Sequence, residues 1–235
     1  MKIFQLLLTI FFSTIAIAGT YSKTEKMELA AKDVELIDID CGAGFLKVRG
    51  VENSDKIEVT AEIEVQGISG DELEEFIKRH VTLTLEKSSK KAVLKSRVEN
   101  GSSYYTNAHI DLTVKVPKQI KLNVNDGSGS IEVTGLSGNL DINDGSGSIE
   151  INEIAGNIRI DDGSGSINVR NVEGDISIDD GSGSMEIVRV SGEVTVSDGS
   201  GSIYINDVSK DVNIIESGSG GLTVRNVQGA VNKRK

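Results

Sequence analysis

The chain has 235 residues and a formal charge of −11, with 36 acidic and 25 basic side chains, one cysteine and no tryptophan. A balance this acidic argues against a nucleic-acid partner, because binding to phosphates requires clustered lysine and arginine. The single cysteine excludes an internal disulfide, and Cys41 is expected to be a small buried hydrophobe. From Asp126 to Ile214 there are 17 acidic and 4 basic residues, so the negative charge is concentrated in that segment.

Residues 1–18, MKIFQLLLTIFFSTIAIA, have the pattern of a secretory signal peptide. Lys2 supplies a positive start, an apolar run extends from Ile3 to Ile15, and Ala-Ile-Ala at 16–18 forms a small-x-small cleavage site. The run is shorter than the ~20 residues that span a bilayer, which favours a signal peptide over a membrane anchor. We therefore expect export to the periplasm, the cell surface or the medium, with no transmembrane segment in the mature chain.

Residues 19–117 contain separate runs of alternating apolar and polar residues, which predict strands with one buried face. The runs cover residues 57–65, 81–85, 92–98 and 110–116. Between the first two, GDELEEFIKRH predicts one short amphipathic helix that starts near Asp71 and carries Leu73, Phe76 and Ile77 on one face. We expect this region to be an irregular β-rich cap that protects the first sheet edge from open-ended pairing.

Residues 118–235 are dominated by the segment Asp-Gly-Ser-Gly-Ser, which recurs at a constant interval of 18 residues. Its aspartates are Asp126, Asp144, Asp162, Asp180 and Asp198. Each period divides into two similar halves, DGSGSIEVT and GLSGNLDIN, in which a Ser-Gly turn precedes an apolar-polar-apolar strand. Two strands and two turns per period predict an all-β fold, a parallel β-solenoid of the β-helix or β-roll kind, with two sheets facing each other across an aliphatic core.

Degenerate versions of the repeat flank the regular array. CGAGFLKVRGV matches DGSGSIEVTGL, with Cys41 at the Asp position and Leu46 and Val48 facing inward. A further coil begins at Ser217 but is one residue out of phase with the others. We expect the basic tail, residues 232–235, to cap the open end of the array.

The stretch VPKQIKLNVNDGSGSIEVTGLSGNLDINDGSGSIEI resembles a bacterial family of exported proteins with β-strand repeats, usually labelled putative adhesins or a domain of unknown function. The resemblance covers roughly Glu35 to Gln228, and includes an early strand pair and a strand-helix-strand insertion. It implies a β-solenoid and a role in adhesion. Its motifs are glycine and alternation, so it supplies no catalytic residue to transfer to this chain.

The recurrent aspartates raise the hypothesis of calcium binding, with Asp126, Asp144, Asp162, Asp180 and Asp198 as the candidate ligands. Calcium rolls built from nonapeptides place Asp after the glycines, whereas here it precedes them, and calcium takes about six to eight oxygens. The alternative is a turn at an exposed corner, in which each Asp side chain bonds the backbone two residues on. Repulsion there is about 1 kcal/mol per pair and screened by salt, so the turn requires no ion.

Other chemistry is weakly indicated. A glycine-rich phosphate loop depends on a helix N-terminus behind it, whereas a strand follows each DGSGS segment. No serine of these segments lies in a G-x-S-x-G elbow, and His80 and His109 lack partners at metal-ligand spacing. We therefore expect no enzymatic activity and no cofactor, with a carbohydrate-active enzyme as a distant alternative.

An outward-facing column of polar residues is the predicted recognition face of the solenoid. It consists of Glu132, Glu150, Asn168, Glu186 and Tyr204. The predicted function is an exported, non-catalytic adhesin or envelope scaffold that binds through its repetitive acidic faces or turn edges. Its expected partners are glycan, matrix or envelope components, and the alternative is a calcium-binding β-roll that holds the metal in its DGSGS turns.

Overall fold

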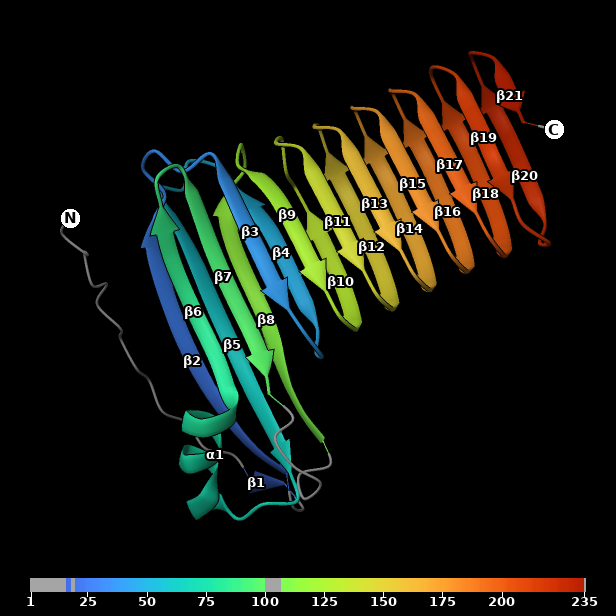
Figure 1. Ribbon diagram of the computed structural model, residues 1–235. Helices are drawn as coiled ribbons and strands as arrows, with labels where there is room; N and C mark the ends of the chain where they lie inside the picture. The colour runs from blue at the N-terminus through green and yellow to red at the C-terminus, as the bar shows by residue number, and fades with distance from the viewer. Residues whose placement is uncertain (1–15, 18–19, 100–106, 235) are drawn as a thin grey trace.

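The computed structural model describes residues 16–17, 20–99 and 107–234, and almost all of them belong to two long sheets packed face to face (Figure 1). The N-terminal strands are β1 (Ala16–Ile17), β2 (Thr20–Ala30), β3 (Leu36–Cys41), β4 (Leu46–Val51), β5 (Lys56–Gln66), β6 (Val81–Ser88), β7 (Lys91–Val98) and β8 (Asn107–Pro117). The predicted signal peptide lies outside the described residues, apart from the two that form β1.

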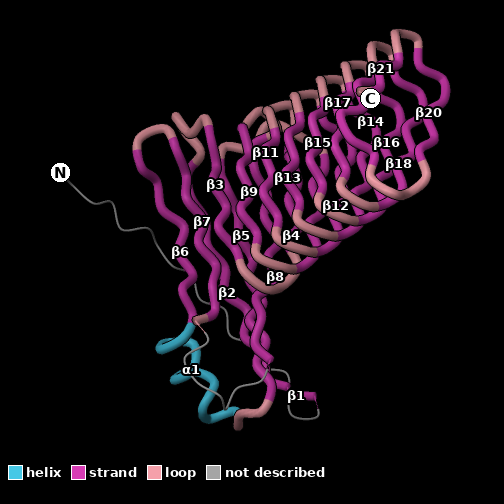
Figure 2. The backbone as a smooth tube through the Cα atoms, turned by 45° about the vertical axis from the view of Figure 1, so that its right-hand side comes forward, coloured by secondary structure: helices cyan, strands magenta, loops and turns pink. Residues whose placement is uncertain are grey.

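The regular coils contribute one strand to each sheet in turn. The first sheet receives β10 (Gly129–Thr134), β12 (Gly147–Ile154), β14 (Gly165–Val172), β16 (Gly183–Val190), β18 (Gly201–Val208) and β20 (Leu222–Val227). The second receives β9 (Lys121–Asp126), β11 (Leu140–Asp144), β13 (Ile158–Asp162), β15 (Ile176–Asp180), β17 (Val194–Asp198), β19 (Val212–Ser217) and β21 (Val231–Lys233). Figure 2 shows these coils stacked one behind another, which confirms the predicted all-β solenoid.

The pairing register follows the 18-residue period of the sequence. Ile131 lies opposite Ile149, and Ile149 opposite Ile167, while in the other sheet Ile142 lies opposite Ile160. These side chains are buried between the sheets, because strand alternation turns every second residue inward. Parallel, in-register stacking therefore produces a continuous aliphatic core along the whole array.

The N-terminal half begins the same two sheets. The strands β3 and β4 form a first coil, in register with β9 and β10, so that Ile39 lies opposite Val124 and Val48 opposite Val133. Beyond them β7 and β8 add parallel strands, and β6, β5 and β2 complete the sheets with antiparallel pairs. Strands on both sides of residue 118 thus share one hydrophobic core.

The predicted short helix is confirmed. A 3-10 turn, η1 (Gly70–Glu72), leads into helix α1 (Leu73–His80), and Leu73 and Phe76 are buried while Ile77 is partly buried. The Ser69 amide donates a hydrogen bond to the Glu72 carboxylate at 2.8 Å, which completes a capping box at this end. Among the described residues, no helix is long and apolar enough to cross a membrane.

The last coil departs from the period as the sequence predicts. Ile203 lies opposite Leu222, an interval of 19, and a register shift between Val196 and Ser197 accommodates the extra residue. In the basic tail, Val231–Lys233 pairs in parallel with β19 and forms the edge strand of the second sheet at the open end of the array.

Deletion of residues 163–180 removes one complete period and is expected to leave a folded, shorter solenoid. The chain then continues from Asp162 into a DGSGS segment in unbroken register. Because each coil contacts only its neighbours, we expect the melting temperature to fall by less than about 10 °C. Deletion of residues 163–171 instead removes half a period, which is the turn after Asp162 and all of β14 except Val172, and we expect no cooperative transition. Thermal unfolding followed by circular dichroism measures both, and equal behaviour of the two deletions would contradict this register.

Candidate functional site

The exact stacking of coils gathers equivalent side chains into columns. Three features stand out: a buried column, an outward-facing column on the first sheet, and a groove along one corner of the coils. We call the buried set the Asp column, and it consists of Asp126, Asp144, Asp162, Asp180 and Asp198. We call the outward-facing set the outer column, and it consists of Glu132, Glu150, Asn168, Glu186 and Tyr204.

The Asp column lies inside the solenoid, where each side chain is at most 5 % exposed. The prediction of an exposed corner was therefore wrong. In β11 the inward residues are Leu140, Ile142 and Asp144, and the other coils repeat this pattern. Strand alternation is the physical reason, since the Asp is the third inward residue of its strand and points into the core before the chain turns.

One oxygen of each carboxyl group closes the turn, as the sequence predicts. The amides of Ser146, Ser164, Ser182 and Ser200 donate to the Oδ1 atoms of the Asp two residues earlier, at 3.0–3.3 Å. At the end of β9, the Gly127 amide donates instead to Asp126 Oδ1, at 2.9 Å. These bonds fix the start of every DGSGS turn.

The second oxygen of each carboxyl group is buried and has no hydrogen-bond partner within the described part of the chain. Burial raises the pKa of all five groups, because the charged form loses its hydration. For Asp144 the pKa rises to about 6, through burial and then the charges of Asp126 and Asp162. For Asp180 burial again comes first, and the charges of Asp162 and Asp198 help to raise the pKa to about 6.

Cys41 and Ser96 continue the column into the N-terminal half. Cys41 lies beside Asp126 in the register of β3 and β9, and burial, followed by the charge of Asp126, raises the pKa of the Cys41 thiol strongly. Ser96 lies opposite Cys41 in the next strand and is also buried. The prediction that Cys41 is buried at the Asp position is confirmed. Ser96 was missed, although it follows Ala92 and Leu94 in the inward alternation of β7.

The calcium hypothesis stays a prediction. Across residues 16–17, 20–99 and 107–234, no group of three or more His, Cys, Asp and Glu side chains is arranged to hold a metal ion. Successive column members are one coil apart, and one oxygen of each is already bonded to the backbone. The arrangement is therefore a line of single carboxyl groups.

The outer column is in register on the first sheet and partly neutralised by basic neighbours. Lys47, in the strand beside β10, forms an ion pair of 2.7 Å with Glu132. Arg170 forms one of 3.0 Å with Glu186 across adjacent strands. Glu150 is exposed, and Tyr204 extends the column at its C-terminal end. The sequence analysis missed both basic partners because they belong to other columns or to the irregular half.

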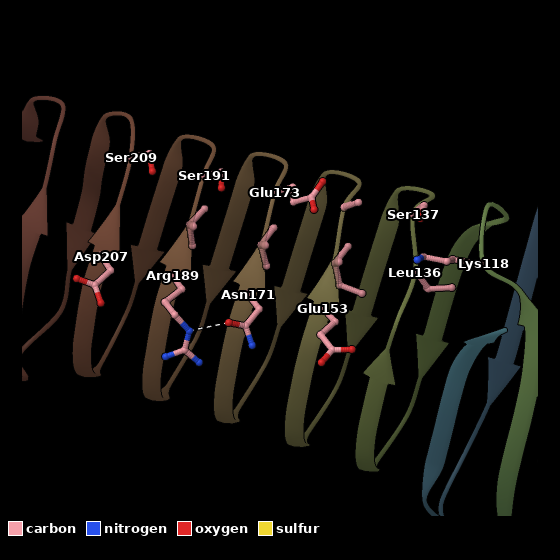
Figure 3. Close-up of a pocket in the computed structure, with 14 residues that line it drawn as sticks. Lys118, Leu136, Ser137, Glu153, Asn171, Glu173, Arg189, Ser191, Asp207 and Ser209 are labelled. Atoms are coloured by element: carbon pink, nitrogen blue, oxygen red, sulfur yellow. Dashed lines mark hydrogen bonds between the residues drawn. The ribbon is translucent and has the colours of Figure 1, made fainter. Parts of the chain in front are cut away.

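A groove of about 750 Å³ runs along the corner where strands of the first sheet turn toward the second (Figure 3). One wall carries Glu153, Asn171, Arg189 and Asp207 from successive coils, and the facing wall includes Glu173 and Ser191. The Arg189 guanidinium donates to Asn171 Oδ1 at 2.6 Å within this wall.

The first wall of this corner groove has an unusual backbone. Glu153, Asn171, Arg189 and Asp207 have φ of 58–61°, the left-handed region that non-glycine residues rarely adopt. In the coil that begins with β10, the equivalent position is Gly135, which has a φ of 73° and directly precedes Leu136, just as Glu153 precedes Ile154. This glycine was an overlooked signal, since it marks a position that requires positive φ.

Comparisons with known proteins identify a family for the chain. A family model described as Toastrack DUF4097 matches residues 37–234. None of the curated proteins matches the chain. Among solved structures, a putative cell adhesion protein from Clostridium sporogenes is 14% identical, with a TM-score of 0.38, over 91% of this chain and 100% of its own. A putative adhesin from Bacteroides fragilis is 12% identical, with a TM-score of 0.39, over 90% of this chain and 97% of its own. Similarity at this distance identifies no ligand.

Proposed function

The chain belongs to the Toastrack DUF4097 family, and we propose that it is an exported, non-catalytic scaffold that binds an extended glycan of the cell envelope or matrix along its corner groove. The groove crosses successive coils, so each coil offers one equivalent contact about 4.8 Å from the next. A polymer with a regular repeat can bind several of these contacts at once. Weak contacts repeated along one rigid axis then add up in binding.

The observation that carries this proposal is the left-handed column on the groove wall. A non-glycine residue in this region costs about 1–2 kcal/mol, and Asn and Asp bear it more easily than other residues. Two of the four positions hold Glu153 and Arg189, which lack the short polar side chains that let Asn and Asp adopt this region. Backbone strain retained at repeated positions supports a role for these side chains in binding.

The chemistry of the groove fits a neutral, hydroxyl-rich polymer. Its walls offer carboxylate, amide, guanidinium and hydroxyl groups, which donate to or accept from sugar hydroxyls. The net charge of −13 between residues 126 and 214 opposes sulfated or uronic polymers. We therefore expect neutral polysaccharides to bind and anionic ones to bind poorly.

The test compares binding of the purified protein to immobilised neutral and anionic polysaccharides. In the double variant Glu153→Gly, Arg189→Gly the backbone strain is relieved and two groove side chains are removed. We expect binding to weaken by about tenfold or more, while the melting temperature stays equal or rises. The combination of weaker binding with unimpaired folding distinguishes a binding role from a structural one.

The matched control removes charge from the outer column with Glu132→Gln and Glu150→Gln. We expect this variant to bind like the unmodified protein. Loss of binding in the control but not in the groove variant would show that the glycan binds at the outer column, and it would contradict binding along the groove. Failure of every neutral polysaccharide to bind the unmodified protein would contradict the glycan class itself.

A further inference from the structure

The Asp column contains more buried acceptors than its surroundings can satisfy. Five buried carboxyl groups follow one another along the core, and the Oδ2 atom of each lacks a hydrogen-bond partner within the described residues. Buried polar atoms are almost always paired in folded proteins, and buried charges even more so. A fully ionised column would consist of acceptors alone, with like charges about 4.8 Å apart.

The groups around the column do not neutralise it. At its N-terminal end Cys41 lies beside Asp126 in the register of β3 and β9, and Arg97 acts on Asp126 from a position where it also pairs with Asp40. Along its length Asp161 and Asp179 add negative charge from the outward face of the same strands, and Glu216 does so near Asp198. Across the core, the first inward residues of the facing strands are Ile131, Ile149, Ile167, Met185 and Ile203.

We propose that the Asp column is a proton-binding site, at which protons from solvent add to the buried Oδ2 atoms and make the solenoid more stable in mild acid than above neutral pH. Each bound proton forms one O–H bond and converts a carboxylate into a carboxylic acid. The acid supplies a donor where the column otherwise has only acceptors, and it removes one of two neighbouring charges. The two members with the largest raised values, Asp144 and Asp180, are separated by one coil, so protonation of both leaves no pair of adjacent charges among Asp144, Asp162 and Asp180.

The direction of the pH effect follows from the pKa values. An aspartate in the unfolded chain has a pKa of about 3.9, and the folded values for Asp144 and Asp180 are about 6. Their contribution to stability is therefore complete below the unfolded value and is lost as the pH rises through about 6. Carboxyl groups with lowered pKa lose their own contribution only at lower pH. These are Glu35, Asp40, Glu58 and Glu72.

The experiment measures thermal unfolding at about pH 5 and about pH 8 for the full protein and two double variants. Asp144→Asn, Asp180→Asn keeps the Oδ1 acceptor of each turn and adds a permanent Nδ2 donor. The control Asp141→Asn, Glu150→Gln changes two exposed residues on the outward faces of β11 and β12 by the same chemistry. In the unmodified protein, each column member with a pKa near 6 shifts the unfolding equilibrium by about 10-fold between the two conditions.

We expect the unmodified protein and the control to melt at clearly lower temperature at the higher pH. The column variant should lose most of this difference and melt at higher temperature than the unmodified protein in the alkaline condition. An equal pH difference in both variants would overturn the proposal.

A second measurement needs no variant to fold. Carboxyl carbon-13 resonances of the aspartates in the unmodified protein are followed from about pH 3 to about pH 8, where Asp in unfolded chains titrates near 3.9. At least two aspartates should titrate near pH 6, the value given by the structure for Asp144 and Asp180. Titration of every aspartate below about pH 4.5 would overturn the proposal. So would a calcium addition at the alkaline end that restores the melting temperature of the acidic condition.

Discussion

Gly165→Ala is expected to abolish the cooperative unfolding transition of the solenoid. Gly165 has a φ of +151°, and a Cβ atom there would lie 1.5 Å from the carbonyl oxygen of Gly147 in the preceding coil. The same close approach recurs at Gly147, Gly183 and Gly201, so the backbones cannot separate in one coil without breaking register in the next. We expect a loss of about 4 kcal/mol or more in the free energy of unfolding.

The matched control is Gly127→Ala, in the same five-residue motif. A Cβ at Gly127 would meet its nearest atom, the Cα of Gly42, at 3.7 Å, an ordinary contact distance. We expect the melting temperature to change by less than about 2 °C. Circular dichroism during heating measures both variants, and a Gly165→Ala protein that melts like the control would contradict the close stacking at this corner.

Ile160→Ala is expected to lower the free energy of unfolding by about 2–5 kcal/mol, the cost of a buried isoleucine plus the cavity that it leaves. Ile160 is 1% exposed and lies between Ile142 and Ile178 of the neighbouring coils. Parallel stacking gives the cavity walls little freedom to collapse, since each wall residue is held in register by its own neighbours. The melting temperature should fall by about 5–15 °C for a chain of this size.

The control for this cavity is Arg159→Ala, one residue earlier on the outward face of the same strand. Surface substitutions away from special features usually change stability by no more than about 0.5 kcal/mol. Thermal or urea unfolding of the two variants gives the comparison. Equal losses in both would show that β13 does not bury alternate residues as described.

The regular coils were predictable because their period is constant. An interval of 18 residues fixes both the register and the inward face, so Ile131, Ile149 and Ile167 had to meet. The burial of Asp144 was predictable by the same counting, since it follows Leu140 and Ile142 at steps of two. The turn-forming residues and the negative charge suggested that the Asp lies at an exposed corner. The alternation of inward and outward residues along the strand instead places it in the core.

The N-terminal half was less predictable, because its contacts join strands far apart in the chain. The strand β7 lies beside β3 only after the chain has passed through β4, β5, α1 and β6. No period specifies this pairing, so the alignment of Ser96 with Cys41 has no local signal beyond alternation. The groove wall was missed for another reason, since positive φ at Glu153 and Arg189 contradicts the preference of those residue types.

The central claim is that DGSGS is the corner of a coil whose aspartate turns into the core and binds protons, so that folding needs no metal. Thermal unfolding of the purified protein in EDTA and in millimolar calcium, followed by circular dichroism, tests it most directly. We predict the same strong β signal and the same melting temperature in both solutions. Folding only with calcium, or a large rise of the melting temperature with calcium, would contradict the claim and make the turns metal sites.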